Sequence, residues 1–257
     1  MNFLAPIGRT FIRFLSATGR LSWFTCRGLS HCVRPPFYWR QIGRQIIDIG
    51  YYSLPVVGLT ALFTGMVLAL QTYSGFSRFD ANSAIPTVVI LSITRELGPV
   101  LTGLMVAGRI GAAIAAELGT MRVTEQIDAL TTLSTNPFKY LIVPRLLAGT
   151  LLLPVLVLLA DIIGVFGGFL VSVYRLDFNA AHYISESWKY LEFRDVTSGL
   201  WKAAAFGFII VLMGSYNGFN SKGGAQGVGA ATTNAVVSAS ILILISNYLL
   251  TGIFFAG

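Results

Sequence analysis

The chain has 257 residues, of which 54% are apolar and only 11% are charged, with a formal net charge of +7. An ordinary soluble domain carries roughly a quarter of charged residues, so this composition excludes that class and predicts an integral membrane protein. The charge does not indicate nucleic-acid binding because it is concentrated at one end: seven arginines precede the first acidic residue, Asp48, and the rest is nearly balanced.

The N-terminal segment, residues 1–48, is predicted to lie on the cytoplasmic membrane surface. Its first apolar residues recur at helical spacing, with arginines between them: Leu4, Ile7, Phe11, Phe14 and Leu15. Such a pattern is typical of a helix in the interface plane, and its arginines hold that side in the cytoplasm. An Arg-rich segment without acids also resembles an organellar transit peptide, which is the alternative. Arg34, Pro35 and Pro36 are expected to end this helix, and Cys26 and Cys32 to be free thiols in a reducing compartment.

Long apolar runs predict five membrane spans. A spanning helix needs about 20 mostly apolar residues, and the runs place the spans at 51–72, 87–119, 142–174, 200–216 and 230–255. With the N-terminus in the cytoplasm, five spans put the C-terminus outside. The second run exceeds the thickness of a bilayer core, so it must tilt, kink at Pro99 or project from the membrane. The fold class is therefore all-α, and an odd number of spans argues against an internally duplicated transporter.

The second span carries small residues at every fourth position, which form one smooth stripe: Gly103, Ala107, Gly111, Ala115 and Gly119. Small residues at this spacing let another helix approach closely. We interpret the stripe as a packing surface for a helix of the same chain or, more specifically, of a second copy.

Ionisable residues inside the spans point to a site. Each costs about 2.5–3.5 kcal/mol at mid-bilayer on insertion scales, so such residues face protein or a watery cavity. Arg95 and Glu96 are adjacent, hence about 100° apart on a helix, and do not stack on one another; a structural ion pair with another helix and a ligand site both stay open. Arg109 and Glu117 lie nearer the cytoplasmic end and are expected to snorkel or form salt bridges. Asp161, in the third span, is expected to make a hydrogen bond between helices.

The loop after the second span has its own pattern. Val123, Ile127 and Leu130 fall on one helical face, whereas Glu125 and Asp128 fall on another. A short amphipathic helix with an acidic face is a docking surface for a partner. The alternative is a solvated connector on the bilayer, but anionic lipids would repel its acidic residues.

Motifs of catalysis and metal binding are missing from the sequence. There is no GxxxxGK[ST], HExxH or GxSxG pattern and no His/Cys cluster with metal spacing. The chain is therefore not expected to be an enzyme, to bind a metal, or to hold a nucleotide through a P-loop.

The stretch RELGPVLTGLMVAGRIGAAIAAELGTMRVTEQIDAL, followed by NPFKYLIVPRLLAG, resembles the MlaE family of ABC permeases, the membrane subunits of MCE-type phospholipid transport systems. The resemblance spans nearly the whole chain as a single permease domain, 1–257. It implies a homodimer in the bacterial inner membrane, with an interfacial helix, five spans and a short coupling helix at about residues 122–133. It also implies a periplasmic C-terminus.

The partners implied are a cytoplasmic ABC ATPase that binds ATP and Mg²⁺, a periplasmic MCE-domain hexamer and a STAS-domain protein, with phospholipid as substrate and no nucleic acid. By motif match, the following residues would line an outward-facing lipid pocket: Leu68, Gln71, Tyr73, Arg95, Glu96 and, at the outer end of the fourth span, Lys202. The ATPase would dock on Arg122, Glu125, Gln126 and Asp128. The function expected is phospholipid movement between the inner membrane and the MCE partner, maintaining outer-membrane lipid asymmetry.

Two rival functions follow from the same residues. An ion-coupled secondary transporter would use Glu96 and Asp161 as a proton relay and would need no ATP. A membrane scaffold would transport nothing, and its in-membrane charges would be replaceable.

Overall fold

The computed structural model describes residues 4–32, 34–77 and 82–255, and within these ranges the chain is helical, without strands. In chain order the elements are α1 (Leu4–Cys32), α2 (Trp39–Ile49), η1 (Tyr51–Ser53), α3 (Leu54–Phe76), η3 (Asn82–Ala84), α4 (Ile85–Ser92), η4 (Ile93–Leu97), α5 (Gly98–Val106), η5 (Ala107–Gly111), α6 (Ala112–Val123), α7 (Gln126–Thr132), η6 (Phe138–Ile142), α8 (Val143–Tyr174), α9 (Ala180–Lys189), α10 (Phe193–Phe219) and α11 (Gly224–Phe255).

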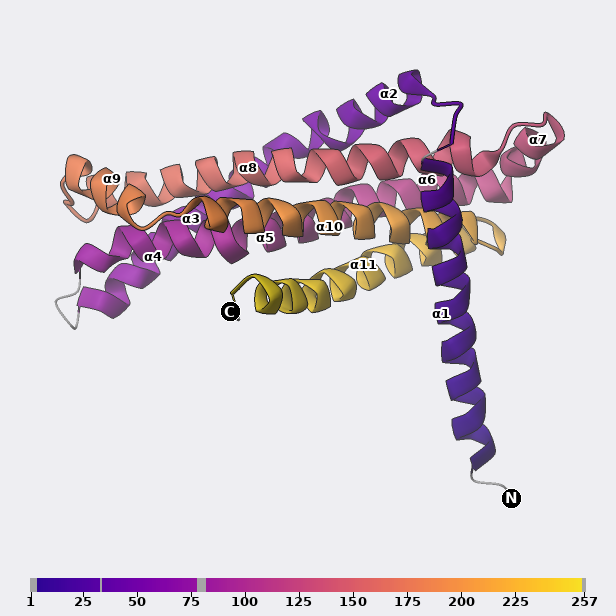
Figure 1. Cartoon of the computed structure of the whole chain (residues 1–257), viewed down its shortest axis with the longest axis horizontal. Coiled ribbons are helices and arrows are strands. Elements are labelled where there is room, and N and C mark those ends of the chain that lie inside the picture. The colour runs from indigo at the N-terminus through magenta and orange to yellow at the C-terminus, as the bar shows by residue number, and fades with distance from the viewer. Residues whose placement is uncertain (1–3, 33, 78–81, 256–257) are drawn as a thin grey trace.

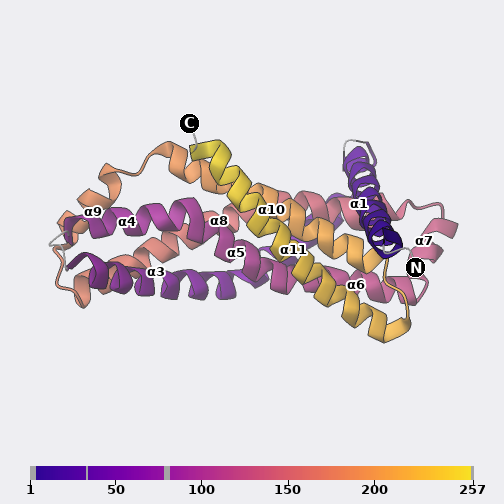
Figure 2. The same cartoon turned by 90° about the horizontal axis from the view of Figure 1, so that it is seen from below.

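Five helical runs of the described chain are long and apolar enough to cross a membrane: Trp39–Phe76, Ile85–Val123, Phe138–Tyr174, Phe193–Phe219 and Gly224–Phe255. They lie side by side in one elongated bundle, with α7 at one end and α9 at the other (Figures 1 and 2). We call these the α7 end and the α9 end. The all-α membrane architecture predicted from the sequence is confirmed.

Helix α1 leaves the bundle sideways near the α7 end (Figure 1). Its described apolar side chains Phe11, Ile12 and Leu15 are each more than 60% exposed, as expected of a helix that lies in the membrane interface. The side chains of Leu4, Ile7, Arg13 and Phe14 lie outside the described residues. As predicted, α1 ends before the Pro35–Pro36 pair, and the thiols of Cys26 and Cys32 are free.

The helical runs extend beyond the predicted spans. The first begins at Trp39, because the amphipathic α2, with Arg40 and Arg44, continues through η1 into the apolar α3. Two connections also differ from prediction. The segment 175–200 contains α9, whose Asn179 side chain accepts a hydrogen bond from the His182 backbone N–H and so caps the helix. The connection between the predicted spans 200–216 and 230–255 is reduced to residues 220–223, and Gly223 and Gly224, the first residue of α11, adopt positive φ angles.

The second run is interrupted by two π-helical segments, η4 and η5. Pro99, in the first turn of α5, lacks the N–H that would bond to the carbonyl of Arg95, four residues earlier. The predicted perturbation at Pro99 thus takes the form of a local π segment, which leaves one backbone acceptor free inside the membrane.

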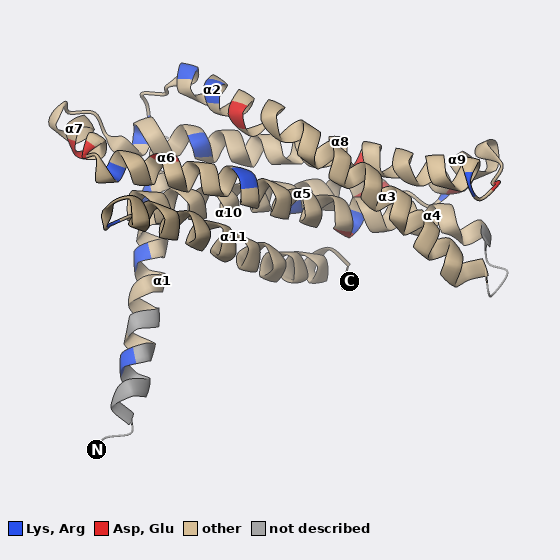
Figure 3. Ribbon diagram, turned by 180° about the vertical axis from the view of Figure 1, so that it is seen from behind, with Lys and Arg blue, Asp and Glu red and all other residues tan. Residues whose placement is uncertain are grey.

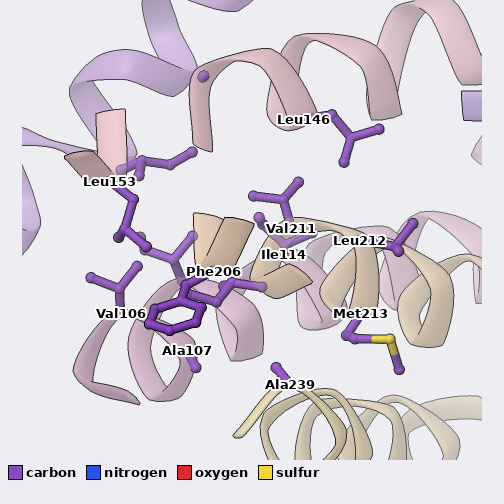
Figure 4. Packing of buried hydrophobic residues seen from close by; sticks show 14 of the residues in the cluster. Val106, Ala107, Ile114, Leu146, Leu153, Phe206, Val211, Leu212, Met213 and Ala239 are labelled. Atoms are coloured by element: carbon purple, nitrogen blue, oxygen red, sulfur yellow. The ribbon is translucent and has the colours of Figure 1, made fainter. Parts of the chain in front are cut away.

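The small-residue stripe of the second run packs within the chain. A β-carbon at Gly103 would lie 3.3 Å from Phe206 of α10, and one at Gly119 would lie 3.3 Å from Val228 of α11. Figure 4 shows Phe206 beside Val106 and Ala107 in the apolar core. The stripe is therefore covered by α10 and α11 of the same chain.

Helices α3 and α8 make a still closer contact. A β-carbon at Gly65 would lie 1.8 Å from the carbonyl oxygen of Gly164, and one at Gly167 would lie 2.3 Å from the carbonyl oxygen of Leu62. Only glycine allows the two backbones to touch in this way. This contact fixes α3 against α8, with the middle of α3 near η4 and its last turns beside α4.

Candidate functional site

Charged residues are concentrated toward the ends of the bundle, and only a few interrupt its middle (Figure 3). Arg95 and Glu96, in η4, belong to these few. The structure gives each of them a separate partner on α10.

Arg95 is anchored to the first turn of α10. Its Nε donates to Asp195 Oδ1 at 2.7 Å, its Nη2 lies 2.7 Å from the same oxygen, and its guanidinium carbon lies 4.6 Å from the centre of the Phe255 ring. Asp195 is only 1% exposed; it is fixed because its Oδ2 accepts the backbone N–H of Glu192 in a capping box. The N-terminal end of the α10 dipole further stabilises this carboxylate.

Glu96 pairs with Lys202, which is completely buried. The Lys202 ammonium donates to Glu96 Oε1 at 2.7 Å, to Thr251 Oγ1 at 2.8 Å and to the Arg95 carbonyl oxygen at 2.9 Å. That carbonyl is the acceptor freed by Pro99. All three donors of Lys202 are thus used inside the protein.

Helix α11 completes the arrangement. Asn247 Nδ2 donates to Glu96 Oε2 at 2.8 Å, and Thr251 Oγ1 lies 2.8 Å from Glu96 Oε1. The charges therefore tie η4, α10 and α11 together. The side chains of Arg95 and Glu96 nevertheless remain 36% exposed, so the structural pairing leaves one edge of each available to a ligand.

The three lipid-site candidates on α3 lie apart from this network. Leu68 and Tyr73 are partly buried against an apolar cluster that includes Ile93 of η4, whereas Gln71 is exposed. Among the described residues, no hydrogen bond joins them to Arg95 or Glu96. The structure brings Arg95, Glu96 and Lys202 together, and lipid contact by all six candidates stays a prediction.

The predicted docking helix is shorter than expected. It begins at Gln126, because Glu125 adopts a left-handed conformation with φ of 59°. Val123 belongs to the preceding helix, α6, and is 38% exposed. The predicted single apolar face from Val123 to Leu130 is therefore wrong. Ile127 is the buried anchor. Among the docking candidates, Arg122 Nη1 donates to Asp128 Oδ1 at 2.6 Å, and Glu125 and Gln126 are exposed.

Two other in-membrane charges find partners near the α7 end. Glu117 forms the predicted salt bridge, with Arg145 Nη2 at 2.8 Å. Arg109 Nη1 donates to Ser53 Oγ at 2.7 Å and to the Asp48 carbonyl oxygen at 3.3 Å. These contacts fix α6 to α8 and η5 to the start of the first run.

The hydrogen bond predicted for Asp161 is not formed by its Oδ1, which is buried without a partner among the described residues. This oxygen lies against Gly98, where a β-carbon would come within 1.8 Å of it. No chain of hydrogen bonds in the described structure connects Asp161 to Glu96, so the proton relay of the ion-coupled alternative gains no support.

Three members of the network were not predicted from the sequence: Asp195, Asn247 and Thr251. Asn247 and Thr251 stand four residues apart in an otherwise apolar span, so they share one helical face, and this spacing was a usable signal. Asp195 lies before the predicted fourth span, 200–216, yet Glu192 and Asp195 have the spacing of an N-terminal capping box, which could have extended that helix.

The chain is similar to known permeases over almost its full length. The family profile described as Permease MlaE matches residues 42–253. A probable ABC transporter permease protein of Rickettsia bellii is 57% identical over 99% of this chain and 98% of its own length. The intermembrane phospholipid transport system permease protein MlaE of Haemophilus influenzae is 35% identical over the same shares of both chains. The chloroplastic protein TRIGALACTOSYLDIACYLGLYCEROL 1 of Arabidopsis thaliana is 40% identical over 88% of this chain and 64% of its own. This chain belongs to the MlaE family of ABC transporter permeases.

Proposed function

We propose that this permease moves phospholipids between the inner membrane and a periplasmic MCE-domain hexamer, and thereby maintains outer-membrane lipid asymmetry. The observation that carries the proposal is Arg95: a guanidinium in a membrane-spanning run, oriented by Asp195 and still 36% exposed. The planar fork of donors on a guanidinium matches the oxygen atoms of a phosphate. The printed name of the Haemophilus influenzae relative supports a phospholipid substrate.

The lipid pocket is proposed to form between two copies of the chain. Arg95 receives the headgroup phosphate, and Leu68, Gln71 and Tyr73 of α3 contact the rest of the lipid. Glu96 and Lys202 then act through Arg95: their pair holds η4 in place, and Lys202 binds the Arg95 carbonyl. In this proposal the partly exposed Arg95 binds the lipid, and the fully buried Lys202 holds Arg95 in position.

The energy for transport is proposed to come from a separate ABC ATPase that binds ATP and Mg²⁺ and docks on α7. The exposed Glu125 and Gln126 and the 60% exposed Asp128 side chain offer it a polar surface. The arginines of α1 and α2 favour a cytoplasmic N-terminus, which puts α7 in the cytoplasm and the C-terminus in the periplasm. A STAS-domain protein on the ATPase completes the proposed assembly.

The lipid site is tested by Arg95→Gln in the purified complex. We expect bound phospholipid, counted by mass spectrometry after mild extraction, to fall about tenfold, since one charge-assisted hydrogen bond to phosphate is lost. Arg175→Gln, an exposed arginine at the α9 end, should leave the lipid content unchanged. Equal lipid content in the two variants would remove Arg95 from the site.

ATPase docking is tested by reversing Glu125 and Asp128 to Lys. The ATPase should no longer co-purify, whereas the permease should remain folded because both side chains are exposed. A stable complex with the doubly reversed chain would exclude α7 as the docking helix.

A further inference from the structure

A second cavity lies at the α7 end, remote in the fold from the Arg95 network and sharing none of its residues. It has a volume of about 520 Å³ and is lined by α1, the end of α6, α7 with the segment that follows it, and the last turns of α10. Phe138, which opens the third run, and Phe219, which closes the fourth, both line it. The cavity therefore lies beside the ends of two spanning runs, next to the arginine-bearing helix α1.

The lining of this cavity is positively charged. Arg20, Arg27 and Arg122 contribute to it, and Asp128 is its one carboxylate. That carboxylate is already engaged, because Arg122 Nη1 donates to it at 2.6 Å. Arg20 Nη1 donates to the hydroxyl of Ser16. Two positive charges are thus in excess, and no unengaged carboxylate in the lining is available to receive a ligand's ammonium group.

Arg27 is held so that its donors stay unused. Its guanidinium carbon lies 4.4 Å from the ring centre of Phe138 and 5.0 Å from that of Trp23. Stacking on aromatic rings fixes the plane of a guanidinium and leaves its N–H groups at the edge. Within the described chain no side chain or carbonyl accepts a hydrogen bond from them. An oriented guanidinium with free donors matches the oxygen atoms of a phosphate.

The remaining walls are amphipathic. Helix α7 contributes the hydroxyl of Thr131, and the segment after it contributes the polar side chains of Ser134, Thr135 and Asn136. Helix α10 contributes the aromatic rings of Tyr216 and Phe219. On α1, Trp23 lines the cavity and is largely exposed, and Leu29, which does not line it, is exposed as well. A glycerophospholipid has this distribution of groups, with a phosphate, ester oxygens and then acyl chains.

We propose that this cavity binds the phosphate headgroup of an anionic phospholipid from the leaflet at the α7 end, with Arg27 as the phosphate ligand. The excess charge and the engaged Asp128 select a headgroup with a net negative charge over a zwitterionic one. The bound lipid bridges α1 to the third and fourth runs. This site is a fixed lipid site, and its existence does not depend on transport at the Arg95 network.

The test compares lipid binding to the full-length permease in detergent by native mass spectrometry, with phosphatidylglycerol and phosphatidylcholine as the two probes. We expect the wild-type chain to retain phosphatidylglycerol in preference. Arg27→Gln should lower its affinity for phosphatidylglycerol about tenfold, the loss expected for one charge-assisted hydrogen bond. Arg40→Gln, an exposed arginine of α2 outside the cavity, is the matched control and should change nothing.

Asn220→Asp provides a second variant on the opposite wall. Asn220 is exposed, and its amide donates only to the Tyr216 carbonyl oxygen, so this change adds a negative charge without removing a buried group and should weaken phosphatidylglycerol binding as well. Three results would each overturn the proposal: equal retention of both lipids, unchanged phosphatidylglycerol binding in both cavity variants, or displacement of the lipid by inorganic phosphate, which would identify a site for a soluble anion.

Discussion

The buried ammonium of Lys202 offers the sharpest test of how the charged network is built. In Lys202→Met, the methionine keeps an unbranched apolar side chain in place of the lysine stem. Glu96 loses its counter-ion, and the Arg95 carbonyl loses its hydrogen-bond donor. Removing one partner of a buried pair costs about 3–5 kcal/mol. Because the Glu96 side chain is 36% exposed, water compensates part of this loss, and we expect the free energy of unfolding to fall by about 2–3 kcal/mol.

The double variant Glu96→Gln/Lys202→Met separates charge from packing. Without the carboxylate no unpaired charge remains, and Asn247 and Thr251 can still bond to the amide, so the double variant should recover at least half of the loss. The Arg95 carbonyl stays unsatisfied and limits the recovery. Unfolding by sodium dodecyl sulfate in mixed micelles measures the free energy of unfolding of the single and the double variant. Two results would show that Lys202 does not neutralise Glu96: a Lys202→Met variant as stable as the wild type, or a double variant no more stable than the single one.

Three further changes test local features. Gly65→Ala would place a β-carbon 1.8 Å from a carbonyl oxygen of α8 and should destabilise the fold by about 3 kcal/mol. Gly75→Ala is the control in the same helix: it has open space around it and should be neutral or slightly stabilising in the same micelle titration. Glu117→Ala removes the partner of Arg145, whose side chain is 4% exposed, and should lower the free energy of unfolding by about 1–2 kcal/mol. Arg145→Met leaves only the Glu117 carboxylate unpaired, and because this carboxylate is 57% exposed the loss of stability should be smaller. The reverse order of stabilities would contradict the burial of Arg145. Burial raises the pKa of the Cys32 thiol, so its thiolate forms only at higher pH. In a chain that lacks Cys26, the rate of maleimide labelling should therefore keep rising above a pH of about 8.5, where an unstructured cysteine is half ionised. A labelling rate that levels off at that pH would show that Cys32 is not buried.

The spans and the interfacial helix could be predicted because hydropathy and arginine content are properties of single segments. The five apolar runs and the amphipathic start of the chain carry their own signal, and the structure adds helix at their ends. The break at Glu125 was not visible in the periodicity, because a single left-handed residue redirects the chain without changing the spacing of apolar residues. The docking helix, Gln126–Thr132, is therefore shorter than the predicted range, about residues 122–133.

The pairing of charges could be predicted only in part. The sequence showed that Arg95 and Glu96 do not stack on one another, since adjacent residues point in different directions, and it left an ion pair with another helix and a ligand site both open. It could not show that both partners come from α10, because that depends on how the fourth run packs on the second. The role of Pro99 in freeing the Arg95 carbonyl follows from local chemistry, but the identity of its donor, Lys202, is a tertiary fact.

The proposed function depends on Arg95 bordering a phospholipid pocket. A density map of the complete transporter in a lipid bilayer tests it most directly. We predict a lipid phosphate within hydrogen-bond distance of the Arg95 guanidinium, with acyl chains along the outer turns of α3. Arg95 and Glu96 sealed between helices, with no lipid beside them, would contradict the account.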